Sequence, residues 1–252
     1  MKSKKLRTIA LVFSVLIFTF PGFAQNTVLN GNWLLDIQLN GIGILQTNMQ
    51  FDAENTNFVA YIRKNADKMI LGNTKAWLAR KFTKNFKNGS LVRIENGKYF
   101  VENDTVKLSG NFISPVGNFV FKGAFVNGEM KAKLTNKNQV RGMIIGKLKP
   151  IEAPLEDYPA LFEKTIALTE SNIFNRNLLQ TKKWKSFAKK MRKISAGAQN
   201  DLEMVFAHYY YAGNLPFSHY SFLKSAQTGN TIHPNMPPSY VSIEEKLPGK
   251  SI

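Results

Sequence analysis

The sequence predicts an α+β protein in which an antiparallel β-barrel-like domain precedes a three-helix bundle and an extended C-terminal tail. Asn-Gly pairs recur between apolar stretches up to about residue 149. Helical periodicity replaces them after three closely spaced prolines, and the last part of the chain is punctuated by Pro and Gly. We therefore expect a β-rich domain over 25–149, a helical bundle over 155–223 and a tail over 224–252.

Residues 1–24 have the three parts of a secretory signal peptide. Four cations precede an apolar run over 9–20, and small residues, Gly22 and Ala24, stand just before Gln25. The alternative is a membrane anchor, but twelve apolar residues rise only about 18 Å as a helix, less than the roughly 30 Å of a hydrocarbon core. We expect cleavage after Ala24, export to the periplasm or the medium, and no transmembrane segment after cleavage.

The composition limits how the exported part is stabilised and what it binds. The chain has no cysteine, so disulfides and thiolate metal sites are excluded, while 19 Phe, 8 Tyr and 3 Trp supply apolar surface for ordinary cores. The formal net charge of +17 fits a nucleic-acid, anionic-membrane or acidic-polymer partner, or a generally basic exported protein. Because the cations are spread along a chain expected outside the cytoplasm, we expect no nucleic-acid partner.

The β-rich region is predicted from its turns and its alternation. Asn-Gly favours type I′ hairpin turns, because both residues tolerate a positive φ. Before Asn127-Gly128, Phe119, Phe121 and Phe125 share one strand face with Gly123. After it, apolar residues at 130, 132 and 134 alternate with charged ones at 129, 131 and 133. A second hairpin is expected to turn at Asn96-Gly97, joining 91–95 to 98–102, and a last strand is expected near 140–148. One helical interruption is expected over about 74–86, with these residues on one side: Trp77, Ala79, Phe82 and Phe86.

The first strand is expected to begin at Gly31-Asn32-Trp33. This tripeptide resembles the Gly-x-Trp opening of lipocalin-type barrels, in which the tryptophan plugs the closed end. The resemblance implies a barrel that could hold a ligand. The residue types alone favour a tryptophan that is simply part of the core.

Three helices are predicted after the prolines. The first covers about 158–175 after the N-cap Asp157, the second follows Thr181, and the third covers about 198–212. Each has an apolar stripe at helical spacing. The other face of the second helix carries seven Lys or Arg residues, which we interpret as a solvated face rather than a membrane or polyanion site.

The residues that could carry chemistry are few. None of the three histidines (His208, His219 and His233) has metal-ligand spacing, and no Gly-rich phosphate loop or Gly-x-Ser-x-Gly elbow occurs. We therefore expect no metal and no cofactor. His208 lies beside a run of three tyrosines on the third helix and is expected at a packed edge of the bundle.

One segment is more specific. Ser218 and His219 follow the third helix within the run Leu215-Pro216-Phe217-Ser218-His219-Tyr220. A Ser-His pair placed just beyond a helix can hold an imidazole beside a site that is built elsewhere. An exposed Ser-His turn without a catalytic role is the alternative.

The run from about 158 through 223, ending in this Ser-His turn, resembles the helical segment that opens tail-specific (C-terminal-processing, tricorn-type) serine peptidases. Exported relatives of that family place a β-rich domain before it. The resemblance implies that His219 is the general base and Ser218 a supporting residue. It also implies that the nucleophilic serine and a further acidic residue lie downstream in an α/β domain. The chain stops at Ile252, where that domain is expected to begin, and 240–243 is expected to be its first strand.

Two functions follow as expectations. The first is an exported, non-catalytic N-terminal portion of such a peptidase, which contributes at most a general-base half-site and is inactive alone. Its partner would be a peptide or protein substrate. The second is a periplasmic or surface binding module whose barrel holds an apolar ligand or a protein partner. The oligomeric state is left open by both.

Overall fold

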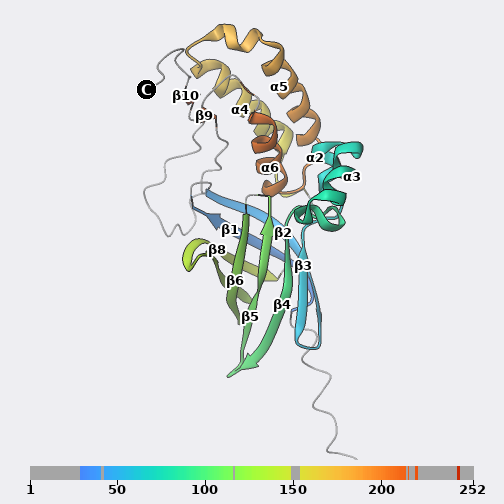
Figure 1. The fold of residues 1–252 in the computed structure, drawn as a ribbon. Coiled ribbons are helices and arrows are strands. Elements are labelled where there is room, and N and C mark those ends of the chain that lie inside the picture. Colours follow the sequence, from blue (N-terminus) through green and yellow to red (C-terminus); the bar gives the residue numbers. More distant parts are fainter. Residues whose placement is uncertain are drawn as a thin grey trace, which may run out of the picture.

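The computed structural model describes residues 29–40, 43–115, 117–148, 154–213 and 215, together with the backbone of 219–220 and 243–244 (Figure 1). The predictions of a signal peptide over 1–24 and of an extended tail over most of 224–252 fall outside the described residues.

Eight antiparallel strands form a closed barrel, so the expected α+β class with an N-terminal barrel is confirmed. Each strand pairs with the next along the chain, and β8 pairs with β1 from Trp33↔Leu148 to Leu39↔Gly142, which closes the sheet. The strands are β1 (Gly31–Leu39), β2 (Gly43–Glu54), β3 (Asn57–Tyr61), β4 (Arg93–Glu102), β5 (Thr105–Ser114), β6 (Gly117–Val126), β7 (Glu129–Asn136) and β8 (Gln139–Leu148).

Strict alternation along the strands fills the barrel with apolar side chains. In β1 every second residue from Trp33 to Leu39 is buried, and β2 alternates in the same way. Trp33 is fully buried and makes edge-to-face contacts with Phe51 (5.9 Å between ring centroids) and Phe125 (4.9 Å). Its indole N–H donates to the carbonyl oxygen of Leu29 at 3.0 Å. Trp33 is therefore part of the core.

The turns show which Asn-Gly pairs end strands. Asn127 (φ 51°) and Gly128 (φ 81°) both adopt positive φ between β6 and β7, as the predicted hairpin requires. The hairpin predicted at Asn96-Gly97 is wrong. β4 continues through this pair without turning back. Its pairing with β5 shifts register between Glu95 and Lys98, so the pair forms a β-bulge. A Cβ at Gly97 would collide with the backbone of β3, so this glycine serves a close approach between strands.

A helical insertion joins β3 to β4 and consists of α2 (Ala66–Leu71), α3 (Asn73–Phe82) and η1 (Lys84–Gly89). The predicted helical interruption is present, although α3 ends at Phe82 and Phe86 lies in η1. Trp77 is 59% exposed and Phe82 is 75% exposed, while the buried residue of α3 is Ala76. The side chain of Arg80 binds the buried carboxylate of Asp67 through two hydrogen bonds of 2.8 Å, which turns the opposite side of α3 to the solvent.

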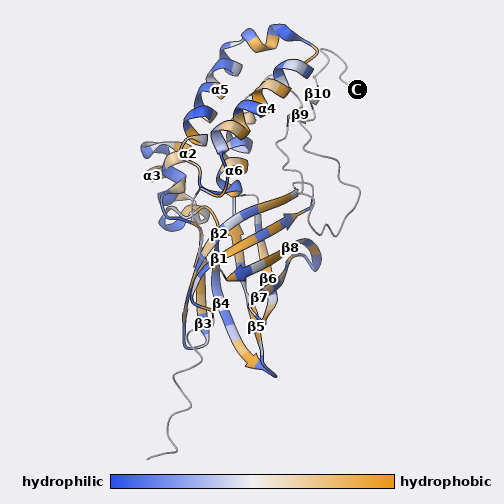
Figure 2. Cartoon of the chain, turned by 180° about the vertical axis from the view of Figure 1, so that it is seen from behind, coloured by the Kyte–Doolittle hydropathy of each residue, from blue (hydrophilic) through white to orange (hydrophobic). Residues whose placement is uncertain are grey.

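The helices after the barrel are α4 (Tyr158–Asn172), η2 (Arg176–Gln180), α5 (Lys182–Ser195) and α6 (Asp201–Ala212). The predicted N-cap Asp157 accepts a hydrogen bond from the N–H of Ala160 (3.0 Å). The second helix follows Thr181 as predicted, and Thr181 accepts one from the N–H of Trp184 (3.3 Å). α4 packs against α5, α5 against α6, and α6 against α2 and β2. These helices gather at one end of the barrel (Figures 1 and 2). The lysine-rich face of α5 is exposed, as expected.

Candidate functional site

The segment that precedes the Ser-His pair begins with a helix, α6, that is attached to the barrel by a buried carboxylate. Asp201 is 2% exposed. One of its oxygens accepts a hydrogen bond from the backbone N–H of Gln46 in β2 at 2.6 Å, and the other accepts from the hydroxyl of Tyr158 in α4 at 3.0 Å. Burial and the nearby Asp201 charge raise the pKa of Tyr158 far above its ordinary value, so this hydroxyl stays a donor. Asp201 therefore joins α6, α4 and β2 at one point.

A second buried carboxylate holds the first turn of α6. Glu203 forms a bidentate pair with Arg63, which follows β3, through bonds of 2.7 Å and 2.9 Å. Arg63 also donates to the carbonyl oxygen of Gly197 (2.8 Å), and the N–H of Gln199 donates to Glu203 (2.9 Å). Burial raises the pKa of Glu203, although Arg63 acts in the opposite direction. The loop before α6 is thereby tied to the barrel end.

The C-terminal end of α6 is also held. The hydroxyl of Tyr211 donates to the carbonyl oxygen of Ile70 in α2 at 2.6 Å. Beyond the helix, the N–H of Leu215 donates to the carbonyl oxygen of Ala212 at 2.9 Å, and the Leu215 side chain is buried. The chain is thus fixed in place to within three residues of Ser218.

The predicted site residues are described only in part. Ser218 lies outside the described residues. The backbone of His219 lies in the short strand β9 (His219–Tyr220), which pairs antiparallel with β10 (Ile243–Glu244), so that His219 stands opposite Glu244 in register. Sequence reasoning expected a strand over 240–243 but did not single out Glu244. The feature of the sequence that could have indicated Glu244 is its position directly after that predicted strand.

His208 lies in the core between α5 and α6. Its side chain is 1% exposed and its ring meets Phe187 edge-on, with 5.5 Å between ring centroids. Burial lowers the pKa of His208 to about 3, so the imidazole is neutral at neutral pH. A ring enclosed in this way is a packing residue, as the sequence led us to expect.

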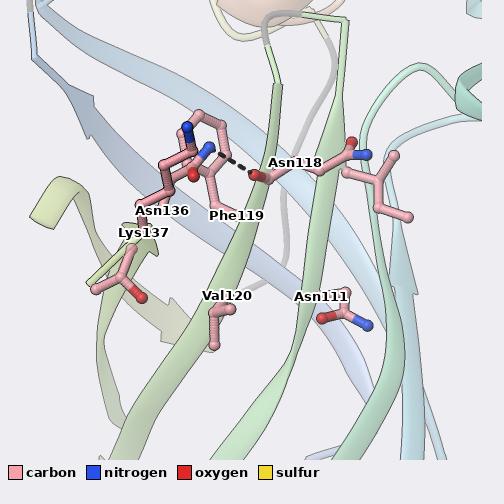
Figure 3. Close-up of a pocket in the computed structure, with 8 residues that line it drawn as sticks. Asn111, Asn118, Phe119, Val120, Asn136 and Lys137 are labelled. Carbon is pink, nitrogen blue, oxygen red and sulfur yellow. Dashed lines mark hydrogen bonds between the residues drawn. The ribbon is translucent and has the colours of Figure 1, made fainter. Parts of the chain in front are cut away.

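The outer wall of the barrel carries a shallow groove of about 280 Å³ where β5, β6 and β7 run together (Figure 3). The side-chain amide of Asn136 donates to the backbone oxygen of Asn118 at 3.4 Å across it. Sequence reasoning missed this groove, because its residues come from three strands and the turn after β7 and share no spacing. They are Asn111, Ile113, Asn118, Phe119, Val120, Thr135, Asn136 and Lys137.

The described residues include neither a candidate metal cluster nor a helix that could span a membrane. No group of three or more His, Asp or Glu side chains comes together there in a way that could hold a metal ion. Nor does any helix in the described ranges have both the length and the apolar character needed to cross a membrane.

The chain was compared with protein-family models, with characterised proteins and with solved structures. None of them matches.

Proposed function

We propose that this chain is the barrel and helical part of an exported serine peptidase of the tail-specific type, and that it supplies half of an active site. In this proposal His219 is the general base and Ser218 supports it, with α4–α6 forming a three-helix bundle that carries the pair. The observation that favours it is the attachment of α6. Two buried carboxylates, Asp201 and Glu203, bind this helix to the barrel end and to the residues that follow β3.

The chemistry of peptide hydrolysis explains why a fixed position matters. Acyl transfer needs a nucleophile, a base within hydrogen-bond reach of it and donors for the oxyanion. A base contributes only when its position is set to within a fraction of an ångström. In the proposal, α6 sets the position of His219, and the nucleophile and oxyanion donors come from an α/β catalytic domain. Glu244, opposite His219 in the β9–β10 register, is a candidate to stabilise the imidazolium.

A chimera tests this proposal. The exported chain is joined at its C-terminus to the catalytic domain of a tail-specific peptidase, and cleavage of an unstructured peptide is measured. We expect His219→Ala to lower kcat by about 10²–10⁴-fold, the usual contribution of a general base. His233→Ala is the matched control, because it removes another histidine from the same part of the chain, and it should leave kcat unchanged.

Two results would contradict the proposal. One is a working chimera in which His219→Ala keeps full activity. The other is labelling of the unfused chain by a fluorophosphonate probe, because that reagent reports an activated nucleophile that the proposal places elsewhere.

A second function, a binding module, is favoured by one observation, the groove on the barrel wall. The barrel interior is filled by aromatic side chains such as Trp33 and Phe121, so an apolar ligand would have to displace them. The groove instead presents amide groups, which suit a polar ligand with several donors and acceptors, such as an extended peptide. Under this reading, Asn136→Ala should weaken the binding of a peptide library by about tenfold, and Asn48→Ala on β2 should not.

A further inference from the structure

Helix α3 turns an apolar face to the solvent. Trp77, Leu78 and Phe82 are 59%, 42% and 75% exposed, and their spacing places them on one side of the helix. We call these three residues the aromatic face. The opposite side carries the buried Ala76 and the Arg80–Asp67 ion pair that attach α3 to the rest of the insertion.

Such a face is unusual for a helix that packs on a domain. The aromatic residues of an amphipathic helix normally turn inward, because their burial is a main source of its stability. Here Trp77 and Phe82 are among the most exposed large apolar residues that the structure describes. Contiguous exposed apolar residues of this kind mark contact sites for other molecules.

The sequence around the aromatic face is rich in positive charge. From residue 68 to residue 94 the sequence contains no Asp or Glu, but it has seven cations. Two of them, Arg80 and Arg93, are paired with Asp67 and Glu95, and the other five are lysines: Lys68, Lys75, Lys81, Lys84 and Lys87. The ammonium group of Lys81 lies 5.2 Å from the ring centroid of Trp77 and 5.7 Å from that of Phe82. Apolar rings and cations therefore share one surface.

We infer that α3 is a contact site for an anionic phospholipid surface. Tryptophan and phenylalanine rings that project from a helix insert at headgroup depth, while lysine stems lie along the rings and place their charge among lipid phosphates. Each such lysine contributes to attraction by an anionic leaflet. α5, with its exposed lysines, lies on the same side of the molecule as α3 in both views, so its charge adds to this attraction (Figures 1 and 2).

An acidic protein is the competing occupant, and two features favour lipid over it. A protein–protein interface generally requires a broad complementary surface of about 800 Å² on each partner. The aromatic face is a narrow strip on a convex helix, with its rings projecting outward. Lipid headgroups are mobile and can close around projecting rings without a matching shape, so a narrow strip is sufficient.

Vesicle sedimentation tests the inference on the chain purified after export. We expect binding to phosphatidylcholine vesicles that contain about 30% phosphatidylglycerol, little binding to phosphatidylcholine alone, and weaker binding in high salt. The double variant Trp77→Ser/Phe82→Ser should lower the partition coefficient at least about tenfold. The matched control, Phe100→Ser/Phe174→Ser, removes two exposed aromatic residues elsewhere and should bind like the wild type.

Tryptophan fluorescence gives a second and more local readout. The other two tryptophans, Trp33 and Trp184, are buried, so Trp77 dominates any response to an added surface. On anionic vesicles we expect a blue shift and protection from iodide quenching. Trp77→Phe should keep binding within about threefold of the wild type, since an aromatic ring remains, but lose the spectral change.

Three results would overturn the inference. The first is a wild-type chain that does not bind anionic vesicles. The second is a double variant, Trp77→Ser/Phe82→Ser, that binds them as well as the wild type. The third is binding to soluble polyglutamate as tight as binding to vesicles, without a change in Trp77 fluorescence, because that pattern identifies an acidic polymer as the occupant.

Discussion

Acid is expected to destabilise the helical part of this protein through one residue, His208. Its imidazole is buried against Phe187, and burial lowers its pKa from 6.5 to about 3. The unfolded chain therefore binds a proton at this residue well before the folded chain does. The stability that the neutral ring contributes is fully present above pH 6.5, and it is lost progressively as the pH falls from 6.5 toward 3.

The size of this loss follows from the difference between the two pKa values. One pKa unit corresponds to about 1.4 kcal/mol, so the loss is about 2 kcal/mol at pH 5 and approaches 5 kcal/mol near pH 3. Native domains are stabilised by only about 5–15 kcal/mol. Protonation of this single ring thus removes most of the stability of a domain at the low end of that range, and about a third of it at the high end.

Urea unfolding between pH 7.5 and pH 4, followed by far-UV circular dichroism, measures the effect. In His208→Leu an apolar side chain fills this position of the core, and it has no group that can be protonated. The free-energy difference between the wild type and this variant should shift in favour of the variant by about 2 kcal/mol from pH 7.5 to pH 5. His233→Leu is the control for removing a histidine. If His208→Leu and the wild type lose stability in parallel over this range, the reasoning about burial is refuted.

Three further predictions concern the core, the junction and the N-terminus. Trp33→Ala should lower the free energy of unfolding by roughly 3–5 kcal/mol, because it removes a fully buried ring with two aromatic contacts, whereas Trp77→Ala should change it by less than about 0.5 kcal/mol. Equal urea midpoints for the two variants would contradict the barrel core described above. Asp201→Ala should cost about 2–5 kcal/mol and loosen α6, since two buried donors lose their acceptor; unchanged hydrogen exchange in α6 would exclude that role. Intact mass of protein from an exporting host should show a start at Gln25, and a retained basic N-terminus would disprove the signal peptide.

The predictions that succeeded depend on local chemistry. Asn127-Gly128 makes a hairpin because the two residues accept positive φ, whatever surrounds them. Thr181 caps α5 because a hydroxyl at that position satisfies an N–H that the helix leaves free. Alternation of apolar residues in β6 and β7 likewise places Phe121 and Leu134 inside the barrel. In each case the structure is determined by residues that lie close together in the sequence.

The failures depend on contacts between distant residues. The sequence does not indicate which side of α3 is buried, because that side is held by Asp67, thirteen residues before its partner Arg80, and hydrophobic periodicity carries no information on such a pair. Asn96-Gly97 has the composition of a turn, but β3 lies against it and makes it a bulge. Of the candidate site, the sequence could indicate the Ser-His segment. It could not indicate the buried carboxylates beneath it, since Asp201 meets Gln46 across 155 positions.

The closure of the barrel has a consequence for the order of folding. β1 is completed only by β8, more than a hundred residues later, so the sheet stays open until residue 148 is available. Contacts of such long range slow the search for the native topology. Until the last strand arrives, β1 is paired with β2 alone, and its other edge can join another chain. A chain crossing a membrane in an extended form would emerge with β1 first and would carry this edge for most of its passage. A chaperone that binds extended segments could cover this edge of β1 during that time.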